Sequence, residues 1–214
     1  MGDLHSFIYS EEVLKFVKSS KNFANWLEEE EDIDSKSFII NGLKLMPELY
    51  SQMISIPPFD PVFNDTAEKF VTEEDWSRVY QKVANSLGVL NDYNDIAQKT
   101  EYDRSELVCR QISEDISDIY QDIRDFLEIF RNSPEEIMND GLWECKANFE
   151  SSWGGKVLRV SKAMHDIYIS DDSLTMQDEQ NNSKNESTKQ FNTRDWFISK
   201  RQQEFRGEDG TIPE

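Results

Sequence analysis

The sequence is short of the residues on which most catalytic centres depend. Among its 214 residues there are only two histidines and two cysteines, and neither pair has the close spacing of zinc ligands. A Ser-His-Asp device would depend on His165, which the helical pattern places at a polar edge beside Asp166. The sequence has no Glu-x-x-His pair for a di-iron bundle and no glycine-rich phosphate loop. Composition therefore excludes these chemistries.

Long apolar stretches are also missing. No segment approaches the roughly 18 consecutive apolar residues that cross a bilayer, and the first residues lack a charged-then-apolar leader. Cys109 and Cys145 lie far apart, in no metal or redox spacing. We expect both within helices, as reduced and partly buried thiols. These absences predict a cytoplasmic protein.

Positive charge is scarce, and negative charge is abundant. The chain has 43 acidic residues against 23 basic ones, a formal net charge of −20. Such a surface repels phosphate backbones and anionic lipids, so we expect neither nucleic acid nor membrane as a partner. A hydrophobic content of 37% still supplies one core. A well-solvated surface with no specific partner, cationic partners or divalent ions would each suit this charge.

Helical periodicity dominates residues 1–170 and predicts an all-α bundle of about five to six helices. Helices are expected from Ser10, from about Ser35 to Met53 with a kink or break at Pro47, and from Thr72 to Gly88. Two connections are expected between helices: residues 55–61 as an extended crossover and residues 89–104 as a loop or distorted turn.

Two long helices, about 105–131 and 134–169, are predicted to form an antiparallel hairpin around a short turn at Ser133-Pro134. The first helix carries an apolar stripe with coiled-coil-like spacing, which we expect to pack on the side of the second that runs from Leu142 to Met164. The stripe consists of Ile112, Ile116, Ile119, Ile123, Phe126 and Phe130.

One flank of that stripe is acidic. Asp115, Asp118, Asp122 and Asp125, here called the acidic row, fall on one arc of the helix. They could hold Mg²⁺ or Ca²⁺ if a second helix added oxygens, or they could pair with Lys and Arg neighbours. The metal alternative would make the chain a carboxylate- and magnesium-dependent hydrolase of nucleotide-like substrates. All-α enzymes of that kind use acidic pairs on facing helices, whereas here the clear pairs share one helix.

Polar residues on the apolar face of the second long helix suggest partners for the acidic row. One or both of Lys146 and Lys156 are predicted to reach carboxylates on a neighbouring helix, or else to extend to solvent. Trp143 projects about 100° from that face, so it packs elsewhere or is exposed. Gly154 and Gly155 indicate a close helix approach or a kink.

Composition changes after residue 170. We expect residues 171–192 to be a flexible polar linker and residues 193–214 to hold a short basic-aromatic helical segment with Trp196 and Phe197, followed by a tail. The tail segment could meet the acidic body, a sister subunit or another protein. The residues that we single out for interaction are Trp143, Lys146, Trp196 and Phe197.

Parts of the sequence resemble a bacterial family of domains of unknown function, DUF5063. The resemblance lies in Phe70 to Trp76 and in a longer stretch that starts at Asp118 and includes Leu142 to Lys146 and Trp153-Gly154. It covers roughly residues 10–170. It implies a bacterial cytoplasmic protein with a helical fold, and it transfers no activity, cofactor or catalytic residue.

The sequence thus favours a protein-interaction or adaptor domain over an enzyme. Its expected partner is another protein or a second copy of the chain. No cofactor is predicted, except magnesium under the hydrolase alternative.

Overall fold

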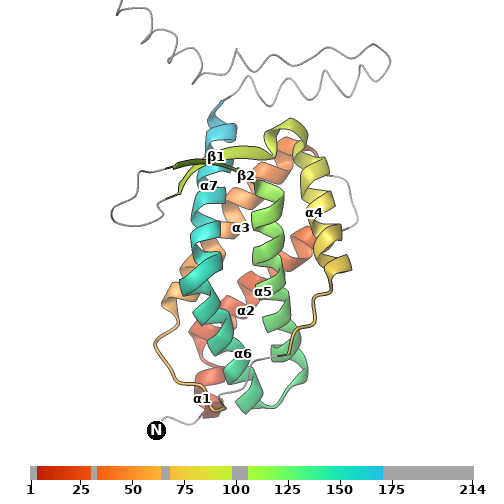
Figure 1. Ribbon diagram of the computed structural model, residues 1–214. Helices are drawn as coiled ribbons and strands as arrows, with labels where there is room; N and C mark the ends of the chain where they lie inside the picture. Colours follow the sequence, from red (N-terminus) through yellow and green to blue (C-terminus); the bar gives the residue numbers. More distant parts are fainter. Residues whose placement is uncertain (1–3, 30–32, 64–67, 98–105, 171–214) are drawn as a thin grey trace, which may run out of the picture. The chain divides into compact units, whose positions relative to one another are not determined.

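The computed structural model describes residues 4–29, 33–63, 68–97 and 106–170, which form an all-α bundle with one small sheet (Figure 1). The fold class is therefore as predicted. The first part of the chain forms α1 (Leu4–Ile8), α2 (Glu11–Glu28), α3 (Ser35–Ser55) and α4 (Glu73–Leu87). A 3₁₀ turn, Gly88–Leu90, and the strands β1 (Asp92–Ala97) and β2 (Glu106–Gln111) follow, then α5 (Ile112–Asn132), α6 (Glu135–Asn148), a π-helical turn (Phe149–Trp153) and α7 (Gly154–Ile169).

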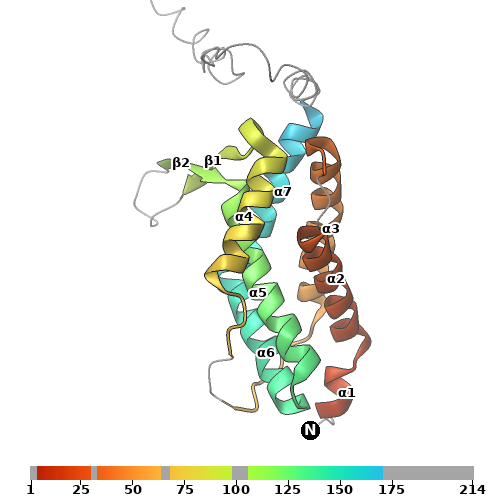
Figure 2. The ribbon, with the colours of Figure 1, turned by 90° about the vertical axis from the view of Figure 1, so that its right-hand side faces the viewer.

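Four helices surround the core. α2 packs on α3, α3 on α7, α7 on α5 and α5 on α2, which closes a ring, while α4 packs on the outer side of α5. Figure 2 shows α2 and α3 on one side of the bundle and α5 and α6 on the other. None of the helices described is long and apolar enough to cross a lipid bilayer.

The predicted helical hairpin is confirmed. α5 and the continuous run from α6 to α7 pack against each other. The apolar stripe of α5 is buried from Ile112 to Phe126, and Phe130 is partly buried against the same core. Leu142, Trp153 and Met164 are buried on the facing side.

Local signals set most helix ends where the sequence indicated. Thr72 and Asp75 form a complete capping box at the start of α4, and Gly88 follows its end with a φ of 54°, a conformation that glycine adopts without strain. α3 continues through Pro47, so of the predicted kink or break, the break does not occur. Met46 and Leu49 are fully buried on either side of the proline, and their burial outweighs one lost backbone hydrogen bond.

The segment before α5 differs from prediction. α5 begins at Ile112 rather than near 105, and residues 106–111 form β2, which pairs antiparallel with β1. The predicted loop over 89–104 thus contains a strand. Cys109 lies on β2 and is exposed, so its placement in a helix was wrong, whereas Cys145 is buried in α6. Predictions for residues 171–214, including Trp196 and Phe197, lie outside the described residues.

Candidate functional site

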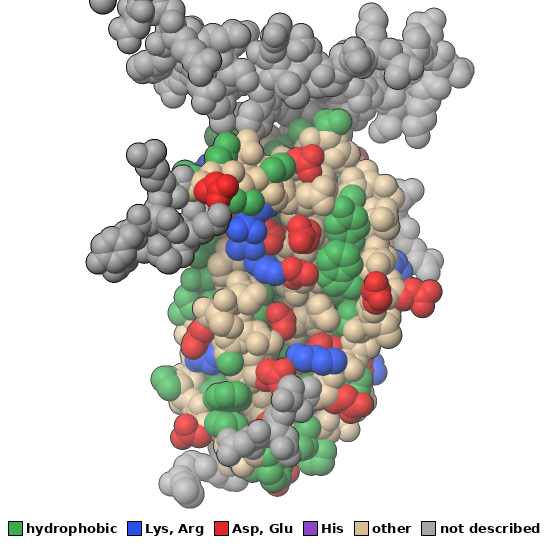
Figure 3. Space-filling model, in the orientation of Figure 1, with side chains coloured by type: hydrophobic (Ala, Val, Ile, Leu, Met, Phe, Trp, Pro, Cys, Tyr) green, Lys and Arg blue, Asp and Glu red, His purple; other side chains and the backbone are tan. Residues whose placement is uncertain are grey.

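The acidic row runs along α5. On the face of the molecule shown in Figure 3, acidic and basic side chains lie among one another, and a hydrophobic stripe lies beside them over α4. Asp115, at the upper end of the acidic row, is buried. Arg159 of α7 donates to both carboxylate oxygens of Asp115, from Nε at 2.9 Å and from Nη2 at 2.5 Å. The hydroxyl of Tyr93 on β1 donates to Oδ2 of the same carboxylate at 2.5 Å. Asp115 therefore ties β1 to two helices.

Asp118, one turn further along, also has two donors. The ammonium group of Lys156 on α7 forms an ion pair with Oδ2 of Asp118, and the indole Nε1 of Trp76 on α4 donates to Oδ1 at 3.0 Å. The prediction that Lys156 reaches the acidic row is confirmed. The Trp76 ring stacks on Tyr80, with ring centroids 5.3 Å apart, so this aromatic pair is held against α5.

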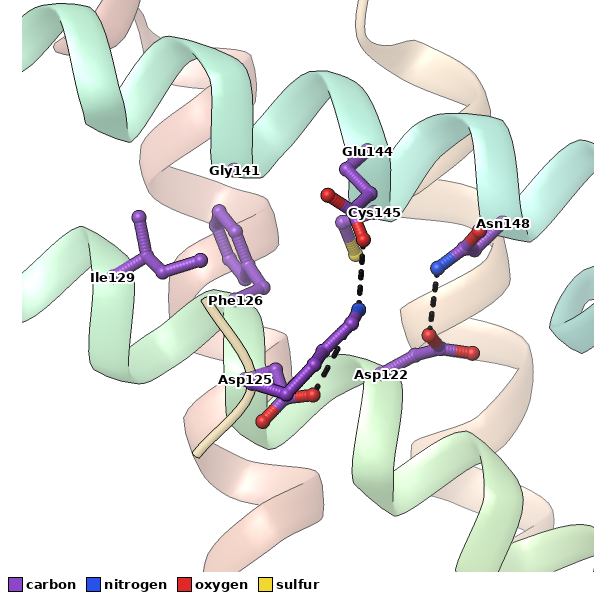
Figure 4. Close-up of a pocket in the computed structure, with 9 residues that line it drawn as sticks. Asp122, Asp125, Phe126, Ile129, Gly141, Glu144, Cys145 and Asn148 are labelled. Atoms are coloured by element: carbon purple, nitrogen blue, oxygen red, sulfur yellow. Dashed lines mark hydrogen bonds and ion pairs between the residues drawn. The ribbon is translucent and has the colours of Figure 1, made fainter. Parts of the chain in front are cut away.

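A small open hollow lies at the lower end of the row, between α5 and α6 (Figure 4). Nδ2 of Asn148 donates to Asp122 at 2.8 Å. Burial raises the pKa of Asp122 above its ordinary value, and Asn148 and Lys69 offset only part of that rise. Burial also raises the pKa of the Cys145 thiol, which lines the same hollow, so this cysteine is a poor nucleophile.

Asp125 has a structural connection to the segment that precedes α4. Its Oδ1 accepts the backbone N–H groups of Phe70 and Val71 at 2.7 and 2.8 Å. The ammonium group of Lys69 lies 3.9 Å from Oδ2 of Asp125 and 2.8 Å from Glu144 of α6. This end of the α3–α4 connection is thus fixed to α5 by a buried carboxylate.

Asp140 does the same nearer the middle of that connection, and sequence reasoning missed it. The carboxylate is buried in α6, and its oxygens accept the backbone N–H groups of Val62 and Phe63 at 2.6 and 2.7 Å. An aspartate beside Gly141 and Leu142 on the apolar side of a helix is the available signal, because a buried carboxylate needs donors.

Lys146 takes a different partner from the predicted one. Its ammonium group donates to the carbonyl oxygen of Ile56, at 2.5 Å, and not to a carboxylate of the acidic row. The lysine therefore secures the end of α3 against α6.

Within the residues that the structure describes, the carboxylates of the acidic row are bound by hydrogen-bond donors of the chain itself. Nowhere among them do three His, Cys, Asp or Glu side chains gather closely enough to hold a metal ion. Each aspartate of the row instead accepts hydrogen bonds from side chains or backbone groups of neighbouring elements. Magnesium binding by Asp115, Asp118, Asp122 and Asp125 stays a prediction.

The hairpin of β1 and β2 is firmly attached at its base and on its inner face. Asn91 and Ser113 exchange two buried hydrogen bonds, both of 2.9 Å. Tyr93 reaches inward to Asp115, and Arg110, opposite Tyr93, pairs with Asp95. Figure 1 shows the hairpin across the end of the bundle at which α7 finishes.

The outer face of the hairpin is open. Ile96 and Leu107 are direct partners across the two strands, and they are 64% and 69% exposed. We call these two residues the apolar pair. Neighbouring Asn94 and Cys109, also partners across the strands, are exposed as well. Trp143 on α6, predicted to pack elsewhere or to be exposed, is 41% exposed, and the apolar pair is both more exposed and contiguous.

These features define a helical bundle that carries a surface β-hairpin. Its similarity to known proteins shows the family. The chain belongs to the family described as Domain of unknown function (DUF5063), which matches residues 7–170. It is also similar to a crystal structure of protein BF1032 from Bacteroides fragilis, with 32% sequence identity and a TM-score of 0.66. That similarity covers 75% of this chain and 94% of the other. No curated protein matches the chain.

Proposed function

We propose that the chain is a protein-interaction domain and that the apolar pair of the hairpin, Ile96 and Leu107, is its docking point. The observation that carries this proposal is the exposure of the two side chains, 64% and 69%, at directly opposed positions of a short ribbon. Two large apolar side chains at opposed positions on the surface favour burial against another molecule, since water contact costs free energy in proportion to apolar area.

The attachment of the hairpin supports the proposal. The Asn91–Ser113 bonds and the Tyr93–Asp115–Arg159 group hold the ribbon on the bundle, so that its outer face is presented in one orientation. A docking element that is ordered before binding loses less conformational entropy when the partner arrives. The charged groups beneath it are engaged with one another, which favours a structural role for the acidic row over a catalytic one.

The test replaces both members of the apolar pair with serine, Ile96→Ser and Leu107→Ser, in the full chain. The matched control is Leu158→Ser on α7, where a leucine is 53% exposed. Proteins captured from the native host with the wild type and the control should include at least one that the double variant fails to retain. Identical sets for all three chains, with circular dichroism confirming that each is folded, would contradict the proposal.

We also propose two features that belong with this function. The segment around Trp196 and Phe197 would be a second interaction element, which truncation after residue 170 would remove. The chain would work in the cytoplasm, a proposal that the free thiols of Cys109 and Cys145 support, because disulfides are rare in that compartment.

A further inference from the structure

The hydrogen-bond pattern of the hairpin shows which backbone groups face outward. The N–H of Ile112 donates to the carbonyl oxygen of Asn91 at 2.9 Å, so this pair, next in register after Asp92 and Gln111, is a hydrogen-bonded one. In an antiparallel ladder, bonded and non-bonded pairs alternate. Asp92–Gln111, Asn94–Cys109 and Ile96–Leu107 are therefore non-bonded pairs, and their N–H and C=O groups point away from the partner strand.

The outer edge of β1 is partly blocked. Oδ1 of Asp95 accepts the N–H of Ile96 at 2.9 Å, so the outward-facing donor at this position is already occupied. This bond agrees with the alternation deduced from Asn91 and Ile112, since the N–H of Ile96 must point away from β2 to reach Asp95. A side chain that covers an edge donor protects a strand from pairing with other chains.

The outer edge of β2 has no such protection. Leu107 and Cys109 present their N–H and C=O groups outward, and no hydrogen bond reaches these N–H groups within the part of the chain that the structure describes. Both side chains are exposed beside that edge. An open strand edge next to an exposed apolar side chain is the arrangement to which an extended segment adds as a further strand.

Charge indicates what kind of segment fits. The two strands carry three acidic residues, Asp92, Asp95 and Glu106, against one basic residue, Arg110, and Arg110 is already paired with Asp95. The whole chain carries a net charge of −20. A second copy would bring the same charge to the interface and be repelled, whereas a basic segment would be attracted.

We propose that β2 is the recognition strand of the domain: an extended, basic segment of a partner protein adds to the outer edge at Leu107 and Cys109. Its apolar side chains would pack beside Leu107. This inference rests on the proposed function, because it specifies how a partner uses the same hairpin.

The probe is a fluorescein-labelled heptapeptide, Lys-Val-Lys-Val-Lys-Val-Lys, whose binding to the full chain is followed by fluorescence anisotropy. Two further peptides serve as controls: a fully N-methylated version with the same charge and side chains, and a version with Glu in place of Lys. We expect binding of the first peptide only, since N-methylation removes the backbone donors and Glu reverses the charge. Equal binding of the N-methylated peptide would overturn the proposal.

Two proline variants test the edge itself. Cys109→Pro removes an outward N–H of β2 without removing a bond between the strands, and Asn94→Pro does the same on β1, at the opposed position. We expect Cys109→Pro to weaken peptide binding about tenfold, through the lost donor and the ring placed at the edge. Asn94→Pro should bind as the wild type does. Equal losses in both variants would contradict an assignment to β2.

The outcomes separate this inference from the proposed function. The apolar-pair double variant could lose partner capture while Cys109→Pro still binds the peptide and the captured partner fully. That result would support the docking point and overturn strand addition. Capture that survives the double variant would overturn the docking point itself. A concentration-dependent dimer in sedimentation experiments, abolished by Cys109→Pro, would replace the basic partner with a second copy and so overturn the proposal.

Discussion

At the scale of single residues, the bundle is joined by carboxylates with assigned donors, of which Asp115, Asp125 and Asp140 are buried and Asp118 is partly buried. Asp115 receives an arginine and a tyrosine, Asp125 and Asp140 receive pairs of backbone N–H groups, and Asp118 receives a lysine and an indole. Hydrogen bonds to charged acceptors contribute about 1.5–3 kcal/mol each. These aspartates connect irregular segments and the hairpin to α5 and α6. Apolar packing alone would leave the orientation of those segments and of the hairpin loosely defined.

Sequence reasoning recovered part of this arrangement. Helical projection placed the four aspartates of the acidic row on one arc and Lys156 on the facing helix, and the ion pair of Lys156 with Asp118 follows from that geometry. Projection could not foresee the backbone donors at Val62 or Phe70, because these lie in an irregular connection whose path depends on tertiary packing. Arg159 and Tyr93 were missed for a similar reason, since Tyr93 lies on an unpredicted strand.

Asp122 gives a prediction with a defined dependence on pH. Burial raises its pKa above the ordinary value, so the folded state favours the protonated acid, and the ionised form lowers stability at neutral pH. That cost is complete above the raised pKa and vanishes below the unfolded value of about 3.9. Asp122→Asn should therefore increase the free energy of unfolding at pH 7, with a gain that shrinks as the pH falls toward 4.

Urea denaturation of wild type and variant across this pH range measures the effect. Asp166→Asn on α7 is the control, since Asp166 is exposed and pairs with the nearby Lys162 along the same helix. A loss of stability at pH 7 in Asp122→Asn, or a difference that does not vary with pH, would show that burial of this carboxylate has been misjudged.

At the scale of elements, α6 and α7 form one run through a π-helical turn. The N–H of Gly154 bonds to the carbonyl oxygen of Phe149, which closes the wider turn. A Cβ at position 154 would lie 2.6 Å from that oxygen and 2.8 Å from the Phe149 ring, whereas a Cβ at position 155 would meet nothing closer than 3.9 Å. The two adjacent glycines thus have different roles, because only the one at position 154 leaves room that the turn needs.

The two glycines form a matched pair for mutation. Gly154→Ala should lower the free energy of unfolding by about 1–3 kcal/mol, because the added methyl group overlaps Phe149. Gly155→Ala should raise it by about 0.5–1 kcal/mol, as alanine loses less entropy in a helix. Thermal and urea denaturation measure both changes. Equal effects of the two substitutions would indicate that no π-turn exists at this position.

The hairpin shows why element prediction failed where it did. Residues 92–97 contain two aspartates and an asparagine, which are poor strand formers, and the apolar Ile96 and Leu107 face solvent and not the core. Prediction from amphipathic periodicity depends on apolar side chains being buried. It therefore fails for strands whose apolar side chains face solvent. The strands are defined by the Asn91–Ser113 anchor and by Tyr93, which are tertiary contacts.

At the scale of the whole molecule, the fold was the most predictable property. Isoleucine and phenylalanine spacing along α5 determines a buried stripe, and periodicity likewise gives α2, α3 and α7 one buried face each. The ring that these four helices close depends on contacts between elements far apart in sequence, and it was not predicted. Function was less accessible, because the proposed docking point depends on two side chains that are left exposed. Exposure is a property of the assembled structure and is not visible in composition.

The measurement that tests the docking claim most directly is hydrogen exchange of the full chain, followed by mass spectrometry, with and without the partner captured by the wild type. We predict slower exchange in residues 106–109 on binding, with the exposed turns of α4 around Arg78 unchanged. Unaltered exchange across the hairpin, with protection centred on α4 or on the surface near Trp143, would contradict the account.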